Sequence, residues 1–586
     1  MKKFSYKGNE FLLDGEPFIV RAGAIHYFRI PRAYWRDRLL KLKECGFNTV
    51  ETYVAWNVHE PREGEFVFDG ENDVSEFLSE AQRLGLYAII RPCPYICAEW
   101  EFGGLPAWLL KNGNMRLRCN YPPYMQKVEK YLHRLFDVLS PHLLSAGGNI
   151  LMMQVENEYG SFGNDKTYLK RLAEIFRECG IDCLLFTADG VWYNMVTSGS
   201  LPERCLPFLT FGSRTSDAMR AIDVVSANTP KMCAEFWCGW FDHWGEEHHV
   251  RNTEDVIKDF EPFLVNRWSF NFYMFCGGTN FGYMNGANFK DGKIHPTVTS
   301  YDYCAPLNEA GDRTETYYAL RNMMRSYGVD VPALTAKESE KIAYGDVKLN
   351  KRMFLLENID KFSEAVTSAC PLFMEEIGQN YGYILYSTTI PFNLENANLY
   401  IDGLADRALV YLNGEKIAVF ERGKEIPDIT INTLDGTEKL DILVENRGRI
   451  NYGQEIYDRK GLIRVRLGFV SLFDWEMFPL FESEIPIAVD ELEECVQEKT
   501  NKPVVCAAFF DVDEANDTFV KLFGVGRGFI VINGKILGRF NYDEGPQKTL
   551  YVPAPFLRAG RNEIVVFSSD GAEASVIATF VNFPEL

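Results

Sequence analysis

The chain has 586 residues, of which 46% are hydrophobic and 24% are charged. This composition is typical of a globular protein and excludes a mainly disordered chain. The formal net charge of −21 repels phosphate backbones and anionic lipid headgroups, so neither nucleic acid nor a membrane surface is an expected partner. The length corresponds to about four domains of about 150 residues each, unless one large barrel accounts for two of them.

The N-terminal segment contains Lys7, Glu10 and Asp14 and has no apolar core, so no signal peptide is expected. The charge-free stretch from residue 268 to 289 is interrupted by Gly and Asn residues, which is not typical of a membrane span. The 14 cysteines follow no disulfide framework. We therefore expect reduced thiols and a cytoplasmic location.

Short apolar runs alternate with amphipathic segments over the first 325 or so residues. Eight of these runs have the length of buried strands, at 18–26, 49–53, 87–92, 150–157, 184–187, 207–211, 232–236 and 270–275. Helical periodicity separates most of them, and several helical segments end in Gly. The pattern predicts a (β/α)₈ TIM barrel over residues 1–330. A doubly wound open sheet is the alternative, although no Gly-rich phosphate turn follows the first run.

Beyond Pro332 the pattern changes to short alternating runs separated by Asp, Asn and Gly, which is typical of β-sandwiches. The segment LVYLNGEKIAVF is repeated as IVINGKILGRF, and each copy contains an Asn-Gly pair expected to form a type I′ hairpin turn. We predict a linker with the first β-strands at 331–395, one β-sandwich at 396–485 and a second at 486–586.

Carboxylates at the C-terminal ends of barrel strands are the first candidates for catalysis, because barrel enzymes place their active sites at that face. The fourth run ends in QVENEYG and the seventh in AEFWCGW, which point to Glu158 and Glu235. Glu156 is a rival, two positions before Glu158. A pair of carboxylates suits glycosidic cleavage, with one neutral to protonate the leaving oxygen and one ionised to attack. A structural role for acids at a barrel rim is the alternative.

Aromatic residues near the predicted strand ends strengthen the hypothesis of a sugar site, because pyranose rings pack on aromatic faces. These residues are Tyr53, Trp56, Tyr95, Trp100, Trp108, Trp237, Trp240, Trp244, Tyr283 and Tyr303.

Together with the segments that surround them, the motifs QVENEYG and AEFWCGW resemble those of the β-galactosidases of glycoside hydrolase family 35. The resemblance covers most of the chain, from GAIHYFRIP, ETYVAWNVHEP and RPCPYICAEWEFGGLPAWLL to GGTNFGYMNGAN and NGKILGRFNYDEGPQKTLYVPAPFLRAGRNEIVVF. Within the family the chain is most similar to compact bacterial enzymes that prefer β-1,3-linked galactosides. The resemblance implies that the two sandwiches are jelly-roll, galactose-binding-like domains.

The resemblance also implies roles for particular residues. Glu158 would be the general acid/base and Glu235 the nucleophile, with Glu156 held by hydrogen bonds below the site. The residues expected to bind galactose are Tyr53, Cys97, Ala98, Glu99, Asn157, Tyr283 and Tyr303. Where the family often has RPGPY, this chain has Cys93 in place of the Gly, and Cys238 and Cys304 are further departures.

Three aromatic residues are predicted to contact the leaving group. Trp240 and Trp244 follow the nucleophile and would lie under the leaving sugar. Tyr452, in GRINYG of the first sandwich, would reach over the barrel mouth, although a purely structural role is an equal alternative.

The chain is thus predicted to be a retaining exo-β-galactosidase that acts on terminal β-D-galactose without a cofactor or metal. The acids and histidines between Asp242 and His249 fit no zinc spacing and are interpreted as a solvated rim. Alternatives are another retaining exo-β-glycosidase, a transglycosylase, or a catalytically silent carbohydrate-binding protein. The sandwiches are compatible with sugar binding, with bracing of the barrel, or with the interface of a homodimer.

Overall fold

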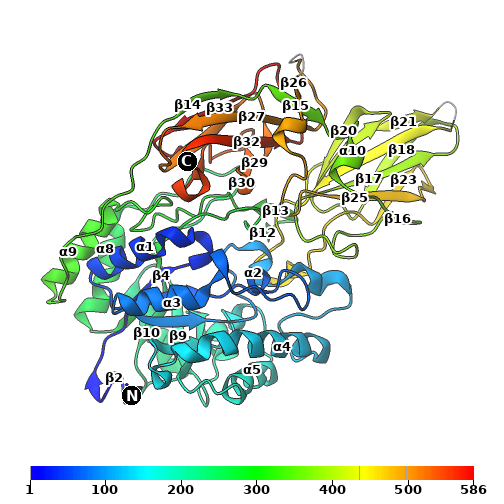
Figure 1. Ribbon diagram of the computed structural model, residues 1–586. Coiled ribbons are helices and arrows are strands. Elements are labelled where there is room, and N and C mark those ends of the chain that lie inside the picture. The colour runs from blue at the N-terminus through cyan, green and yellow to red at the C-terminus, as the bar shows by residue number, and fades with distance from the viewer. Residues whose placement is uncertain (1, 434–435, 495–497) are drawn as a thin grey trace.

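The computed structural model describes residues 2–433, 436–494 and 498–586. Eight parallel strands close into a barrel in the order β10-β11-β4-β5-β6-β7-β8-β9, as the sequence predicts (Figure 1). The strands are β4 (Arg21–Ile25), β5 (Thr49–Tyr53), β6 (Tyr87–Arg91), β7 (Ile150–Gln154), β8 (Leu184–Gly190), β9 (Leu206–Phe211), β10 (Met232–Trp237) and β11 (Ser269–Cys276). Each overlaps one of the predicted apolar runs, and nearly all of their residues are buried.

Helices follow the strands and cover the outside of the barrel (Figure 1). They are α1 (Trp35–Glu44), α3 (Val74–Arg83), α4 (Pro122–Leu139), α5 (Lys166–Glu178), α6 (Tyr193–Gly199), α7 (Thr215–Ala218), α8 (Thr253–Val265) and α9 (Glu315–Ser326). Local sequence marks their ends. Asp73 caps α3 by accepting a hydrogen bond from the Glu76 amide at 2.8 Å, and Asp165 caps α5 in the same way at Tyr168. Gly180, with φ of +80°, follows the end of α5.

The N-terminal strands β1 (Phe4–Lys7), β2 (Glu10–Leu13) and β3 (Glu16–Pro17) form a small sheet of their own. Phe4 and Phe11 are buried in one apolar cluster with barrel residues such as Leu151 and Phe208. This cluster packs the small sheet against the barrel interior.

Two β-sandwiches make up the rest of the chain. The middle sandwich pairs a six-stranded sheet, β16-β25-β17-β22-β19-β20, with β21-β18-β23-β24. Its strands are β16 (Val366–Ser368), β17 (Tyr383–Ile390), β18 (Leu394–Asp402), β19 (Arg407–Leu412), β20 (Glu415–Glu421), β21 (Thr430–Thr433), β22 (Glu438–Glu445), β23 (Arg464–Leu467), β24 (Val470–Ser471) and β25 (Trp475–Leu480).

The C-terminal sandwich pairs β26-β15-β27-β32-β29-β30 with β14-β33-β28-β31. Its strands are β14 (Gly345–Lys348), β15 (Lys351–Phe354), β26 (Glu493–Glu494), β27 (Val504–Val512), β28 (Thr518–Phe523), β29 (Arg527–Ile532), β30 (Lys535–Asn541), β31 (Leu550–Val552), β32 (Gly560–Ser568) and β33 (Ile577–Val581). The strands found between residues 331 and 395 are therefore divided between the two sandwiches, since β14 and β15 pair with C-terminal strands while β16 and β17 belong to the middle one.

The sequence repeat corresponds to a structural repeat. In each sandwich a hairpin, β19–β20 or β29–β30, lies at one end of the six-stranded sheet, and the next long strand pairs beside it. Asn413 and Gly414 have φ of +50° and +79°, and Asn533 and Gly534 have +48° and +76°. Positive φ at both central residues confirms the predicted type I′ turns.

Both sandwiches contact the barrel (Figure 1). The C-terminal sandwich is joined to it by backbone and side-chain hydrogen bonds, such as that from Thr299 Oγ1 to the Arg539 carbonyl at 2.7 Å. The middle sandwich is joined to it through Arg449, which is fully buried and bonds Glu101 of the barrel and Glu375 of the sandwich, each at 2.6 Å. Removal of Arg449 would take this charged partner from both buried carboxylates, at a cost of about 3–5 kcal/mol.

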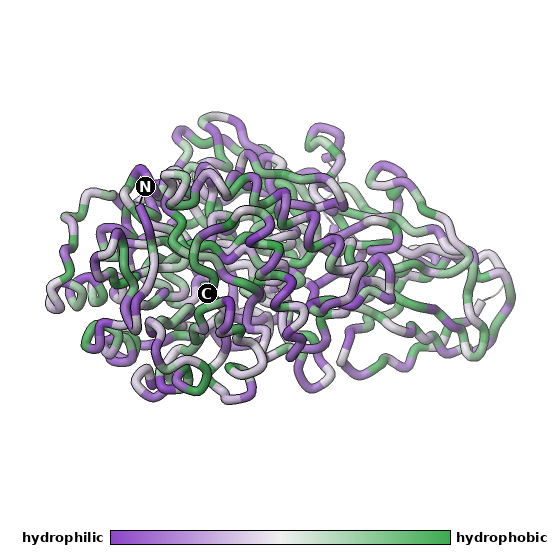
Figure 2. Tube along the Cα trace, turned by 90° about the horizontal axis from the view of Figure 1, so that it is seen from below, coloured by the Kyte–Doolittle hydropathy of each residue, from purple (hydrophilic) through white to green (hydrophobic). Residues whose placement is uncertain are grey.

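Viewed from below, the molecule is elongated, with the middle sandwich at one end (Figure 2). Among the described residues no helix combines the length and the apolar character that a membrane crossing requires.

Candidate active site

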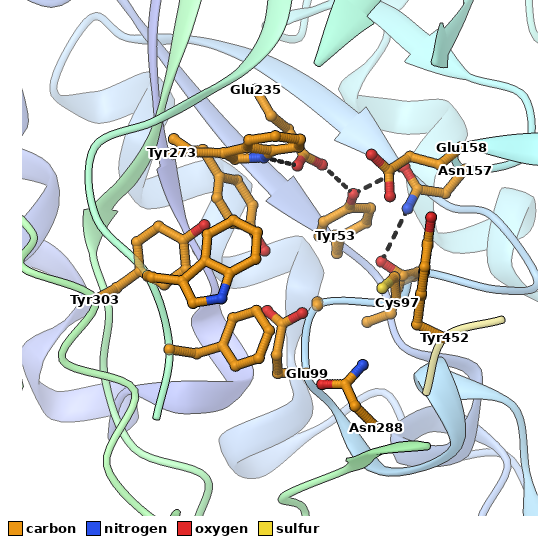
Figure 3. Close-up of a pocket in the computed structure, with 15 residues that line it drawn as sticks. Tyr53, Cys97, Glu99, Asn157, Glu158, Glu235, Tyr273, Asn288, Tyr303 and Tyr452 are labelled. Carbon is orange, nitrogen blue, oxygen red and sulfur yellow. Dashed lines mark hydrogen bonds between the residues drawn. The ribbon is translucent and has the colours of Figure 1, made fainter. Parts of the chain in front are cut away.

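A pocket of about 220 Å³ opens at the C-terminal ends of the barrel strands (Figure 3). It is lined by Tyr53, Ile96, Cys97, Ala98, Glu99, Asn157, Glu158, Glu235, Trp237, Trp240, Phe241, Tyr273, Asn288, Tyr303 and Tyr452. Both predicted catalytic glutamates are present. Tyr53 ends β5, Glu235 lies near the end of β10, and Glu158 follows β7, so strands far apart in sequence supply the reactive groups.

Three donors surround the carboxylate of Glu235. The Tyr53 hydroxyl lies 2.6 Å from Oε1, Arg91 Nη1 lies 2.5 Å from the same oxygen, and Trp237 Nε1 donates to Oε2 at 2.9 Å. Arg91 is completely buried at the end of β6. Charge-assisted hydrogen bonds of this kind stabilise negative charge on the carboxylate and fix its orientation.

Glu158 has a different environment. Its side-chain hydrogen bond within the described chain is a single one, from Thr210 Oγ1 to Oε1 at 2.9 Å. Desolvation in the pocket and the charge of Glu235 raise the pKa of Glu158 to about 7. Figure 3 shows the carboxyl groups of Glu158 and Glu235 on either side of the Tyr53 hydroxyl. The carboxyl group of Glu158 is thus the one that its surroundings favour in the protonated form.

The backbone turn after β7 separates the two glutamates of QVENEYG. Glu156 and Glu158 have φ of +59° and +47°, so the strand alternation expected to place both side chains on one face ends at Gln154. Glu156 points into the protein, where Arg118 Nε and Nη2 bind its two oxygens at 3.0 and 2.7 Å. The geometry supports the structural interpretation of Glu156.

Asn157 lies between these two residues, with its side chain in the pocket. Its Nδ2 donates to the Ile96 carbonyl at 3.2 Å, and its Oδ1 accepts from Arg91 Nη2 at 2.6 Å. The Tyr53 hydroxyl lies 3.0 Å from the same oxygen. The amide is therefore held in one orientation beside both carboxylates.

The loop after β6 places three consecutive left-handed residues in the pocket wall. Cys97, Ala98 and Glu99 have φ of +58°, +56° and +49°. Each such non-Gly residue costs about 1–2 kcal/mol, so surrounding contacts must maintain the loop. Tyr301 Oη donates to Glu99 Oε2 at 2.5 Å, and the Gly286 amide donates to the Glu99 carbonyl at 2.9 Å. Burial raises the pKa of Glu99 to about 7.

Other pocket residues had no individual role assigned from the sequence, which named Trp237 only among the aromatic residues near the strand ends. Trp237, which lies two positions after Glu235 in β10, shares its side of the strand and packs against Trp240 with ring centroids 5.7 Å apart. Tyr273 of β11 packs against Tyr303 at 5.6 Å. Strand alternation within AEFWCGW was the signal for Trp237. Asn288 is the last residue of the motif NGAN and comes from the hairpin strand β12 (Ala287–Lys290).

The structure places two of the predicted sugar contacts, Tyr283 and Trp244, outside the lining of the pocket. Tyr283 is buried in an apolar cluster formed mainly by residues of the two sandwiches, with its ring centroid 5.6 Å from that of Phe529. Trp244 is buried below the surface, and its backbone amide bonds the Pro296 carbonyl. Neither side chain lines the pocket.

Tyr452 does reach the pocket, from the segment that follows β22 in the middle sandwich. Tyr95 Oη bonds the Asn451 carbonyl at 2.5 Å, and Gln454 Nε2 bonds the Phe162 carbonyl at 2.7 Å. These contacts attach both sides of the segment to the barrel.

The rim interpretation of residues 242–249 holds only in part. Glu246 and Glu247 are exposed, but Asp242 is buried. It accepts hydrogen bonds from His248 Nδ1 at 2.7 Å and from the His249 amide at 2.8 Å, so it anchors the loop beside Trp240 and Phe241.

Comparison with known proteins agrees with this geometry. Residues 10–327 match the model of glycosyl hydrolases family 35. The chain belongs to this family. Residues 371–481 match the first all-beta domain of beta-galactosidases, and residues 503–562 match their galactose-binding domain. The protein is therefore a glycoside hydrolase with a catalytic TIM barrel and two all-β domains.

Proteins named β-galactosidase are similar over nearly the whole chain. That of Felis catus is 40% identical over 97% of this chain and 89% of its own length. That of Homo sapiens is 40% identical over 100% of this chain and 90% of its own length. That of Xanthomonas manihotis is 39% identical over 94% of this chain and 91% of its own length.

Proposed function

We propose that this family 35 hydrolase is a retaining exo-β-galactosidase that removes terminal non-reducing β-D-galactose. The observation that carries the proposal is the contrast between Glu235, with three donors, and Glu158, with one donor and a raised pKa. The names of the relatives support galactose as the sugar.

In the first step Glu235 attacks the anomeric carbon and forms a galactosyl-enzyme. Glu158 transfers its proton to the glycosidic oxygen, and the aglycone leaves as a neutral alcohol. Tyr53 and Arg91 stabilise the attacking carboxylate without taking part in the proton transfer.

In the second step Glu158 removes a proton from water, which attacks the anomeric carbon and releases Glu235. The charge of Glu235 is one cause of the raised pKa of Glu158. Because the ester of the galactosyl-enzyme carries no charge, the pKa of Glu158 falls in the intermediate, and the residue becomes available as a base. Two inversions give net retention, for which a carboxyl separation of about 5–5.5 Å is typical.

The size of the pocket supports an exo mode. A volume of about 220 Å³ lies below the roughly 300–1,000 Å³ of drug-sized ligand sites and suits one sugar ring. The residues proposed to bind that ring are Tyr53, Cys97, Ala98, Glu99, Asn157 and Tyr303, all of which line the pocket.

A preference for β-1,3 linkages is the finer part of the proposal. Trp240 and Tyr452, which are 42% and 39% exposed, line the pocket and offer aromatic faces to the first aglycone sugar. The resemblance of the motifs to those of β-1,3-specific enzymes supports this linkage.

Initial rates on nitrophenyl β-galactoside, β-glucoside, β-fucoside and α-galactoside test the sugar, followed by β-1,3- and β-1,4-linked galactosyl disaccharides. We expect turnover of the β-galactoside well above that of the others, a β-anomeric product by NMR, and a higher kcat/KM for the β-1,3 disaccharide. Initial release of the α-anomer would overturn the double-displacement assignment. Equal rates on both disaccharides would overturn the linkage preference alone.

A further inference from the structure

A second hollow adjoins the active-site pocket, and the proposed function gives it no role. Its volume is about 560 Å³, compared with about 220 Å³ for the pocket itself. Glu158, Trp237 and Tyr452 line both. The two spaces therefore meet at the carboxyl group that is proposed to protonate the leaving oxygen.

The shared residues define the direction in which a substrate extends. The leaving oxygen must lie within hydrogen-bond distance of Glu158, while galactose occupies the side of Glu235. Thr210, which bonds Glu158, is also part of the wall of the second hollow. An aglycone longer than one sugar that leaves past Glu158 enters this space.

The wall of the hollow carries the chemistry that binds sugars. Trp192, at the start of α6, is 68% exposed and lines the hollow. An indole face open to solvent next to a cavity is suited to pack against the C–H face of a pyranose.

Arg214 lies on the same wall, just before α7. Its backbone amide bonds Asp259 Oδ1 at 2.9 Å, which fixes the residue in place. Within the described part of the chain its guanidinium has no ion pair or hydrogen bond, and the neighbouring Asp217 pairs with Arg220 at 3.5 Å. The guanidinium thus offers five N–H donors to hydroxyl groups of a ligand.

We propose that this hollow is a binding site for the second sugar of the aglycone, with Trp192 as the stacking face and Arg214 as the hydrogen-bond donor. The inference rests on the proposed function and extends it. The enzyme then acts preferentially on galactosides of at least three sugar units rather than on isolated disaccharides.

The test compares kcat/KM of the full-length protein for a β-galactosyl disaccharide with that for the trisaccharide that extends it by one sugar at the reducing end. We expect the wild type to favour the trisaccharide about tenfold, equivalent to about 1.4 kcal/mol. Trp192→Ala should reduce this ratio to about one, and Arg214→Gln should lower it by a smaller factor.

Tyr193→Ala is the matched control. Tyr193 is adjacent to Trp192 and 70% exposed, but it does not line the hollow. This variant should keep the wild-type ratio. Equal kcat/KM for the two substrates in the wild type, or a ratio that survives Trp192→Ala, overturns the inference while the proposed function stands. Failure of the wild type to hydrolyse nitrophenyl β-galactoside overturns the proposed function and the inference together.

Discussion

The two sides of the active-site pocket hold the same kind of side chain in opposite surroundings. On the β10 side, Glu235 is bound by a hydroxyl, a buried guanidinium and an indole N–H. On the β7 side, Glu158 has one hydroxyl donor and a pKa raised to about 7. In the proposed mechanism, donors and burial, rather than residue type, divide the roles of nucleophile and acid between two glutamates.

Replacement of Glu235 should have the largest effect. Glu235→Ala removes the attacking oxygen, so we expect kcat on dinitrophenyl β-galactoside to fall at least ~10⁴-fold. Added azide should restore turnover and give the α-galactosyl azide, because the azide attacks from the vacated side. Recovery of the β-azide instead would contradict the assignment of the nucleophile.

The loss of activity caused by replacing Glu158 should depend on the leaving group. Glu158→Gln should lower kcat/KM on disaccharides by about 10²- to 10⁴-fold. It should have much less effect on the first step with dinitrophenyl β-galactoside, whose leaving group needs no proton. Pre-steady-state bursts of dinitrophenol measure that step. Equal losses on both substrates would show that Glu158 is not the acid.

The pH profile should show the same asymmetry. Because Glu158 acts in its protonated form, kcat/KM on a disaccharide should fall as pH rises through about 7, by about tenfold per unit. With dinitrophenyl β-galactoside this alkaline decline should be weak. A steep decline shared by both substrates would assign it to another group.

Tyr452 tests whether the middle sandwich contributes to substrate binding. Tyr452→Ala should lower kcat/KM on a disaccharide about tenfold, corresponding to about 1.4 kcal/mol of lost aromatic contact. Tyr452→Phe, which keeps the ring, should remain close to wild type. An unchanged kcat/KM in Tyr452→Ala would leave this residue with a structural role only.

The smallest effect concerns Thr210, which donates a hydrogen bond to Glu158. Thr210→Val keeps the shape of the side chain but removes the hydrogen bond that lowers the pKa of Glu158. The alkaline limb on a disaccharide should therefore move to higher pH by less than about one unit. Thr210→Ser is the control, and a shift to lower pH in Thr210→Val would contradict this account.

Local sequence was sufficient for the framework of the site. The eight apolar runs predicted the eight strands because a buried parallel strand needs a continuous apolar segment. QVENEYG and AEFWCGW placed Glu158 and Glu235 at strand ends, and those ends meet at one face of any such barrel. The Asn-Gly pairs predicted their turns because both central positions require positive φ.

Contacts between distant segments decided which aromatic residues reach the pocket and which partners the buried arginines bind. Tyr283 and Trp244 are aromatic residues of the kind that binds sugars, but both are buried away from the pocket. Tyr283 packs against Phe529 of the C-terminal sandwich. Arg91 and Arg118 acquired their partners only when the strands and loops came together. Short-range periodicity carries no information on such pairings.

The sequence by itself thus determined the barrel, the two β-sandwich modules and the candidate catalytic pair, because hydrophobic periodicity and short motifs depend on only a few neighbouring residues. Only the tertiary structure decided that the pKa of Glu158 is raised, that β14 and β15 join the C-terminal sandwich, and that Tyr452 faces the pocket. Each of these depends on burial or contact between residues far apart in the chain, and these arise only when the chain has folded.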